Sequence, residues 1–253
     1  MTTLQQQFEK DFPNKSVRKI SICRKYENSN FTNYDLDLSG YVRLKILSLG
    51  ENKITSIKLG ECKDLANLGF ENNNLTSIDF LNCLPNPKKL DAVYAYNNNI
   101  QPTNIEVFSR FVNLRSLMIG TMDEHGLKKG KHNKFYGSLK AYKNLTKLEA
   151  ICIEATDVDS GLEYLPFSLA QSTLKKKKEM KRTEIELGRK IYGDSGGYQN
   201  IQCSPYDKKN KCFAIQDQLR KYDYDLMAWQ LAHPHLMYQA QPELFLKLDT
   251  KKR

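Results

Sequence analysis

Residues 44–59, LKILSLGENKITSIKL, and residues 65–80, LANLGFENNNLTSIDF, follow one pattern, L-x-x-L-x-L-x-x-N-x-L. A third clear copy begins at Leu90, and looser copies begin at Val17, Leu114 and Leu148, so successive starts lie 21 to 34 residues apart. The last two leucines of the pattern are two residues apart, which places them on one face of a strand. One copy cannot bury that face alone, whereas neighbouring copies bury it together. The repeat therefore predicts about six stacked units with parallel strands.

The pattern resembles the leucine-rich repeat across residues 17–166. That resemblance implies an α/β solenoid with a parallel sheet on its concave face, which binds proteins or other ligands but has no single function. It also implies that Asn52, Asn73 and Asn98 bond neighbouring turns, because an amide is both donor and acceptor. The TSI turns, the segments FYGSLKAYKNLTKLE and DSGLEYLP, and the W-x-x-x-HP tail are similar to an expanded group of fungal leucine-rich-repeat proteins.

Both ends of such a stack need a cover, because its first and last core layers would otherwise meet water. In residues 1–16, Leu4, Phe8 and Phe12 share one helical face before Pro13, which predicts an N-terminal capping helix. A membrane anchor is less favoured there, because the segment is short and carries little positive charge. Residues 167–253 lose the repeat and are basic, and they predict a mainly helical C-terminal cap around YDYDLMAWQLAHPHLMYQAQPELF.

The repeat region has two irregular places. The long step between Leu114 and Leu148 predicts an insertion near residues 121–145, a stretch that contains several Gly, Lys and His residues. Within residues 103–112, Ile105, Phe108 and Val112 recur at helical spacing, which predicts a helix on the convex side.

The positions that point out of the predicted sheet carry mostly small side chains, and a few larger ones stand out among them. Tyrosines on an exposed sheet face are typical of interface anchors. The predicted partner-binding residues are Tyr94, Tyr96, Met118, Asn67, Glu71 and Asn97. An alternative stays open, in which the insertion near His132 covers these tyrosines. The sequence predicts a protein-interaction module that binds an unidentified protein through the concave face or the 121–145 insertion.

The formal charge of +10 is concentrated late in the chain, since residues 166–253 hold 17 Lys and Arg against 10 Asp and Glu. An alternative function is therefore binding of nucleic acid or an acidic surface by this basic region. It is less favoured, because no aromatic residues interleave with the basic run, and a solvated charged helix is the plainer interpretation. The candidate patch consists of Lys175, Lys176, Lys177, Lys178, Lys181 and Arg182.

Catalysis is not predicted. His125, His132, His233 and His235 lack the spacing of zinc sites, and so do the cysteines, so we expect no metal, no cofactor and no enzyme activity. The segment GDSGG, residues 193–197, matches a serine-protease loop by letters alone and predicts a flexible loop.

The scattered cysteines favour a reducing compartment. No apolar run reaches the roughly 20 residues of a membrane span, and the first residues lack the features of a secretory signal. We therefore expect a cytoplasmic protein without membrane contact, secreted only if a signal peptide has been removed.

Overall fold

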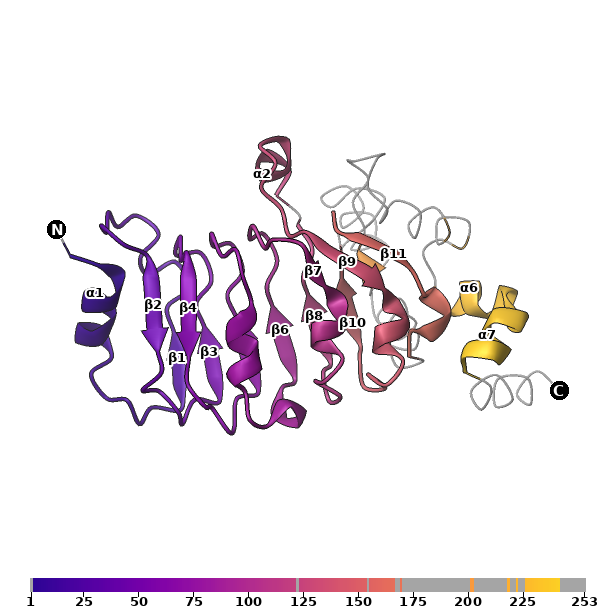
Figure 1. Ribbon diagram of the computed structural model, residues 1–253, viewed down its shortest axis with the longest axis horizontal. Helices are drawn as coiled ribbons and strands as arrows, with labels where there is room; N and C mark the ends of the chain where they lie inside the picture. The colour runs from indigo at the N-terminus through magenta and orange to yellow at the C-terminus, as the bar shows by residue number, and fades with distance from the viewer. Residues whose placement is uncertain are drawn as a thin grey trace, which may run out of the picture.

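The computed structural model describes residues 2–121, 123–153, 155–166, 169, 201–202, 218, 222 and 226–241. The chain is α/β, and most of its strands lie in one parallel sheet at the back of Figure 1. Corresponding positions of the sequence pattern pair across this sheet, so Leu47 lies opposite Ile20 on one side and Leu68 on the other. In sheet order, its described strands are β1 (Lys19–Ser21), β3 (Ile46–Ser48), β5 (Asn67–Gly69), β6 (Ala92–Tyr94), β8 (Ser116–Met118), β10 (Ala150–Cys152) and β12 (Ile201–Gln202).

A second layer of short strands and turns covers the inner face of this sheet (Figure 1). It contains two small parallel sheets and several single-turn 3-10 helices. The first sheet pairs β2 (Asp35–Leu38) with β4 (Ser56–Leu59), and the second has the order β11 (Asp157–Ser160), β9 (Phe135–Ser138), β7 (Thr103–Asn104). The 3-10 helices are η1 (Asp79–Cys83), η2 (Pro87–Lys89), η3 (Ile105–Phe108), η4 (Leu139–Tyr142) and η5 (Leu162–Tyr164).

The helix expected over residues 103–112 is a short strand followed by the 3-10 turn η3. Ile105, Phe108 and Phe111 are all buried, and their spacing of three matches the three residues per turn of a 3-10 helix. Val112 is only half-buried, so the predicted α-helical face was wrong at its last position.

Buried asparagines follow the strands of the main sheet and connect consecutive turns. The side chain of Asn73 accepts hydrogen bonds from the backbone N–H groups of Asn52 and Ile54, at 3.0 and 2.9 Å. It donates to the carbonyl oxygens of Leu49 and Phe70, both at 3.0 Å. Each amide therefore satisfies buried backbone groups of two turns at once, which a buried chain requires.

Asn133 supplies the corresponding amide after the insertion. It is fully buried and donates to the carbonyls of Ala95 and Ile119, both at 2.9 Å, while it accepts from Ile100 N–H. The described segment that leaves the layers is therefore 123–132, around α2 (Glu124–Lys128), and is shorter than the predicted 121–145. The later part of that range belongs to the core through Phe135, Leu139, Tyr142 and Leu145.

Helices lie at the two ends of the layers (Figure 1). At the first end, α1 (Leu4–Asp11) begins with a reciprocal capping box between Thr3 and Gln6. Its Leu4 and Phe8 are fully buried, and the Phe8 ring packs edge-on against Tyr41 at 5.6 Å. These contacts hold α1 against the turn that follows β2.

At the second end lie α6 (Leu226–Ala232) and α7 (Pro234–Ala240). The amides of Gln230 and Gln241 both donate to the carbonyl of Leu165, at 3.1 and 3.0 Å. Gln241 also donates to Glu163, and Trp229 is 3% exposed. The two glutamines thus satisfy the carbonyls at the end of η5.

Candidate functional site on the sheet face

Tyr94 stands out from the open face of the main sheet. It pairs in register with Gly69 on one side and Met118 on the other. Gly69 has no side chain and Met118 is half-buried, whereas Tyr94 remains 37% exposed. Because its neighbours leave it uncovered on one side, Tyr94 offers a rigid aromatic contact surface.

Tyr96 lies deeper than predicted. It is half-buried, and burial, together with the nearby carboxylates of Glu71 and Glu51, raises the pKa of Tyr96 to about 12. Its hydroxyl therefore stays protonated at neutral pH and is available as a hydrogen-bond donor. The two tyrosines do not form a matched exposed pair.

The Glu71 carboxylate lies against the sheet beside these tyrosines. A Cβ on Gly69 would lie 2.9 Å from its Oε2, and a Cβ on Gly50 would collide with its Oε1. Oε2 is enclosed and has no hydrogen-bond partner. Burial raises the pKa of Glu71, a hydrogen bond from its own backbone opposes that rise in part, and the Glu51 charge adds to it. The two glycines therefore leave space in which this carboxylate lies, and none of the ion pairs among the described residues includes it.

Glu51, one turn earlier, has its own partners. Its carboxylate is paired with Arg24 and accepts from the Cys23 thiol at 3.8 Å. Burial first, and then the carboxylates of Glu51 and Glu71, raise the pKa of Cys23. The thiol therefore remains protonated at neutral pH.

Asn97, which the sequence predicted as a partner-binding residue, lies instead in the turn that follows β6. Its φ of 55° is left-handed, a conformation that asparagine tolerates better than most residues. Its amide donates to Asn72 at 2.8 Å and accepts from the N–H of Asp123 at 3.1 Å. Asn67, by contrast, lies on the open sheet face, in register with Ile46 and Ala92, and is half-buried.

The insertion is attached beside this site, where α2 projects from the edge of the layers (Figure 1). Asp123 accepts from the N–H of His125 at the start of α2. Lys131 donates to the side chain of Asn74 at 2.7 Å, and burial lowers the pKa of Lys131. Asn74, Asn97 and Asn133 thus fix the base of the insertion next to the turn that follows Tyr96.

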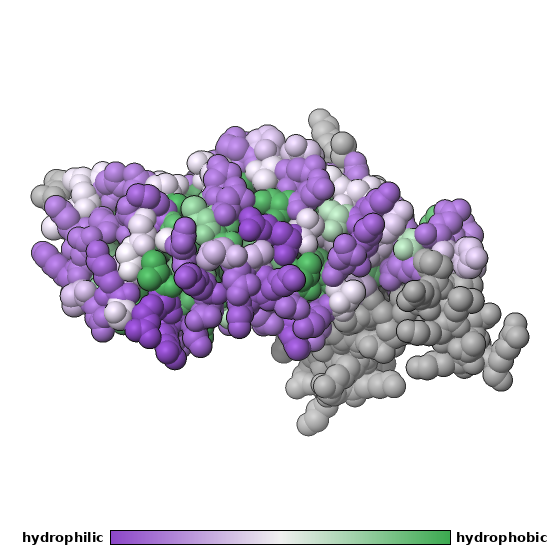
Figure 2. Space-filling model, turned by 60° about the horizontal axis from the view of Figure 1, so that its bottom comes forward, coloured by the Kyte–Doolittle hydropathy of each residue, from purple (hydrophilic) through white to green (hydrophobic). Residues whose placement is uncertain are grey.

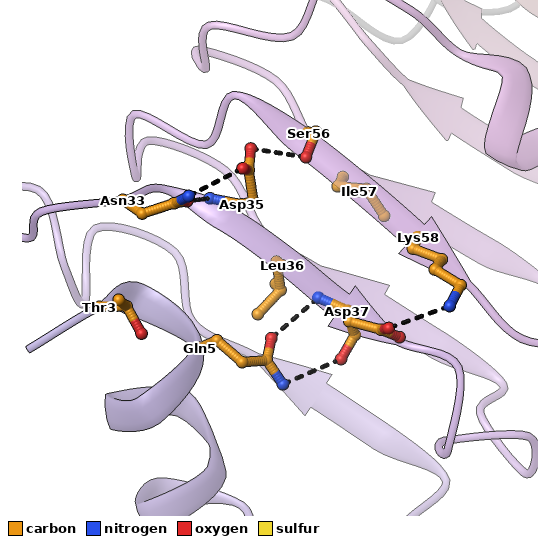
Figure 3. Close-up of a pocket in the computed structure, with 9 residues that line it drawn as sticks. All are labelled: Thr3, Gln5, Asn33, Asp35, Leu36, Asp37, Ser56, Ile57 and Lys58. Atoms are coloured by element: carbon orange, nitrogen blue, oxygen red, sulfur yellow. Dashed lines mark hydrogen bonds and ion pairs between the residues drawn. The ribbon is translucent and has the colours of Figure 1, made fainter.

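A pocket of about 290 Å³ lies elsewhere, over β2 and β4 (Figure 3). Asp35 bonds to Ser56 and Asn33, and Asp37 bonds to Lys58 and Gln5. The volume is at the low end for ligand pockets. Since its polar groups already satisfy one another, we do not regard it as the functional site. It is lined by Thr3, Gln5, Asn33, Asp35, Leu36, Asp37, Ser56, Ile57 and Lys58.

Other predicted features have different outcomes. The basic patch, Lys175 to Arg182, and the GDSGG segment lie outside the described residues. His233 stacks on Trp229 at 4.4 Å and contacts its carbonyl, so it helps to pack α6 against α7.

Within the described ranges, no three His, Cys, Asp or Glu side chains are grouped to hold a metal ion. No helix in the same ranges has the length and apolar character needed to cross a membrane.

The face drawn in Figure 2 is mostly hydrophilic, and its hydrophobic residues form small separate patches. Isolated apolar residues of this kind are normal on protein surfaces.

Comparison of the whole chain with protein-family models and with curated proteins finds no match.

Proposed function

We propose that the chain is a leucine-rich-repeat solenoid, closed at its ends by α1 and by α6 and α7, and that it is a protein-interaction module. The partner would bind on the concave face of the main sheet. The observation that carries this proposal is the 37% exposure of Tyr94 beside Gly69 and the half-buried Met118 on the face of the main sheet. Rigid aromatic side chains in such positions often supply most of the energy of an interface.

The insertion around α2 would form one side of this binding surface on the main sheet. Its base is hydrogen-bonded to Asn97, directly after Tyr96, so a partner on the sheet face would also meet the start of α2. We therefore treat the two surfaces predicted from the sequence as one contact area. Binding of nucleic acid by the basic region remains a sequence-based alternative.

The test compares two tyrosines of similar exposure in different layers. Tyr94 lies on the main sheet, and Tyr136, 44% exposed, lies on β9 of the second layer. The wild-type chain, Tyr94→Ala and Tyr136→Ala are immobilised and exposed to native extract, and retained proteins are quantified by mass spectrometry. We expect Tyr94→Ala alone to reduce retention of specific partners, by about tenfold or more. Equal retention by all three, or loss only with Tyr136→Ala, would contradict the proposal.

A further inference from the structure

Glu71 carries a charge that the described part of the chain does not neutralise. Its Oε2 is enclosed without a hydrogen bond, and none of the ion pairs among the described residues includes it. Arg24 is paired with the neighbouring carboxylate of Glu51. Removing an ionised carboxylate from water without a partner is costly. An incoming cation would therefore recover energy that the free chain lacks.

The space left by Gly50 and Gly69 allows Glu71 to meet such a cation. Oε2 is enclosed at Gly69, so the side chain must rotate away from the sheet before an outside group reaches that oxygen. Rotation breaks no hydrogen bond at Oε2, because there is none. Changes of side-chain rotamer at interfaces are common and need no backbone movement.

The neighbours of Glu71 favour a planar cation. Gly69, under the carboxylate, pairs with Tyr94, and the turn after Glu71 is hydrogen-bonded to Tyr96 through Asn72 N–H. A guanidinium group both pairs with a carboxylate through two N–H groups and stacks on an aromatic ring. Lysine makes the charge contact but lacks the planar fork.

We propose that Glu71 is the receptor for an arginine side chain of a protein partner, held between the Glu71 carboxylate and the ring of Tyr94. This inference rests on the proposed function and specifies the chemistry of the partner. The charge complementarity is local, since the chain as a whole has a net charge of +10. A partner recognised here would therefore need an exposed arginine presented to the sheet face, and general basic character alone would not select it.

The experiment uses a simple probe with the full-length chain. Acetyl-Gly-Arg-Gly-amide is titrated into ¹⁵N-labelled protein, and the amide signals of Gly50, Gly69 and Glu71 are followed by NMR. We expect saturable shifts at these three amides. The citrulline peptide, which has the same shape without the charge, should bind about tenfold more weakly or worse.

Two variants make the experiment specific. Glu71→Gln keeps the shape of the side chain and should weaken binding of the arginine peptide by about tenfold. Glu149→Gln is the matched control: Glu149 is already paired with Arg115, and Arg115 keeps Asp91 as a second partner. We expect this variant to bind like the wild type. Equal binding by Glu71→Gln, or by the citrulline peptide, would overturn the proposal.

Further outcomes identify a different occupant. Binding of acetyl-Gly-Lys-Gly-amide as tight as that of the arginine peptide would overturn the assignment to arginine. Self-association that disappears in Glu71→Gln, measured by sedimentation equilibrium, would assign the site to a second copy of this chain instead. The peptide titration contains no protein partner, so its failure leaves the proposed function untouched, whereas the Tyr94→Ala comparison tests that function without reference to arginine.

Discussion

The Oε1 atom of Glu71 occupies the space into which a Cβ on Gly50 would project, so a side chain at Gly50 would require the Glu71 carboxylate to move. The same carboxylate has an enclosed and unpaired second oxygen. A residue that is unfavourable for the folded chain but well placed for a ligand is typical of binding surfaces. The stability of the free protein should reveal this cost directly.

The first prediction concerns Glu71→Gln and pH. Burial raises the pKa of Glu71 in the folded chain, so its contribution to stability is present at low pH and is lost as pH rises through the folded pKa. We expect Glu71→Gln to raise the free energy of unfolding at pH 7 by about 1 kcal/mol, because a neutral amide loses less on leaving water than an ionised carboxylate does. Urea unfolding at several pH values measures the difference.

Below about pH 4 the Glu71 carboxyl of the wild type is protonated and therefore neutral, like the amide of the Glu71→Gln variant. The difference in the free energy of unfolding should then vanish. Glu149→Gln serves again as the control, because its carboxylate is paired with Arg115. A Glu71→Gln variant that is less stable than the wild type at pH 7 would show that the carboxylate has a stabilising partner.

The second prediction concerns the buried amide of Asn73. It makes hydrogen bonds to backbone groups of two turns, so Asn73→Ala leaves several buried donors and acceptors unpaired. We expect a loss of about 3 kcal/mol or more in the free energy of unfolding, measured by urea denaturation. Asn67→Ala is the matched control, since Asn67 is half-buried on the sheet face, and it should cost less than about 1 kcal/mol. Similar losses for both variants would contradict a special role for the buried amide.

The third prediction concerns the Tyr142 hydroxyl, which is fully buried without a hydrogen bond. Tyr142→Phe removes that polar atom and keeps the ring, so we expect unchanged stability or a gain of up to about 1 kcal/mol. Tyr41 is the matched control, because it is also buried and its hydroxyl donates to the carbonyl of Phe12 at 2.6 Å. Tyr41→Phe should therefore destabilise by about 1 kcal/mol in thermal unfolding. The opposite order of the two variants would refute this account.

Six of the seven described strands of the main sheet were predictable from the sequence, because the core of the pattern recurs in each copy, whereas β12 lies in the region that was predicted to be mainly helical. Apolar residues two apart, such as Leu47 and Leu49, mark a strand face, and one asparagine per copy marks the turn. The alignment of Leu47 with Leu68 then follows from burying the same face in each copy. The buried asparagine after the insertion was not found, because α2 and its flanking residues separate Asn133 from β8.

The candidate site was predictable only in part. The repeat pattern placed Tyr94 on the sheet face. It also predicted that Tyr96 is equally exposed and that Asn97 contacts the partner. Asn97 enters a left-handed turn with its own hydrogen bonds, which depends on the neighbouring copy and on Asp123. The role of Gly50 was also missed. From the sequence, Gly50 is only one of several small residues on the sheet face. Its contact with Glu71 follows from the direction of the Glu71 side chain, which the repeat pattern does not give.

The last prediction concerns acid and the first end of the chain, where β2 would otherwise present an open edge. The side-chain amide of Gln5 accepts from the N–H of Asp37 at 2.8 Å and donates to its carbonyl at 3.2 Å, as a neighbouring strand would (Figure 3). Hydrogen bonds from Ser39 hold the pKa of Asp37 below its usual range, and one from Ser56 does the same for Asp35.

A lowered pKa stabilises the fold above the unfolded value and loses that effect as pH falls through the folded value. We therefore expect amide protection in β2 to fall below about pH 4 before protection in β6 does. Hydrogen exchange, expressed as protection factors at pH 6 and pH 3, measures this order. Asp35→Asn should lower the protection of β2 at pH 6 and reduce the further loss on acidification, whereas Asp64→Asn, at an exposed position, should change neither. Simultaneous loss of protection in both strands would mean that acid acts on the whole fold, and that the carboxylates of this end are not its weakest point.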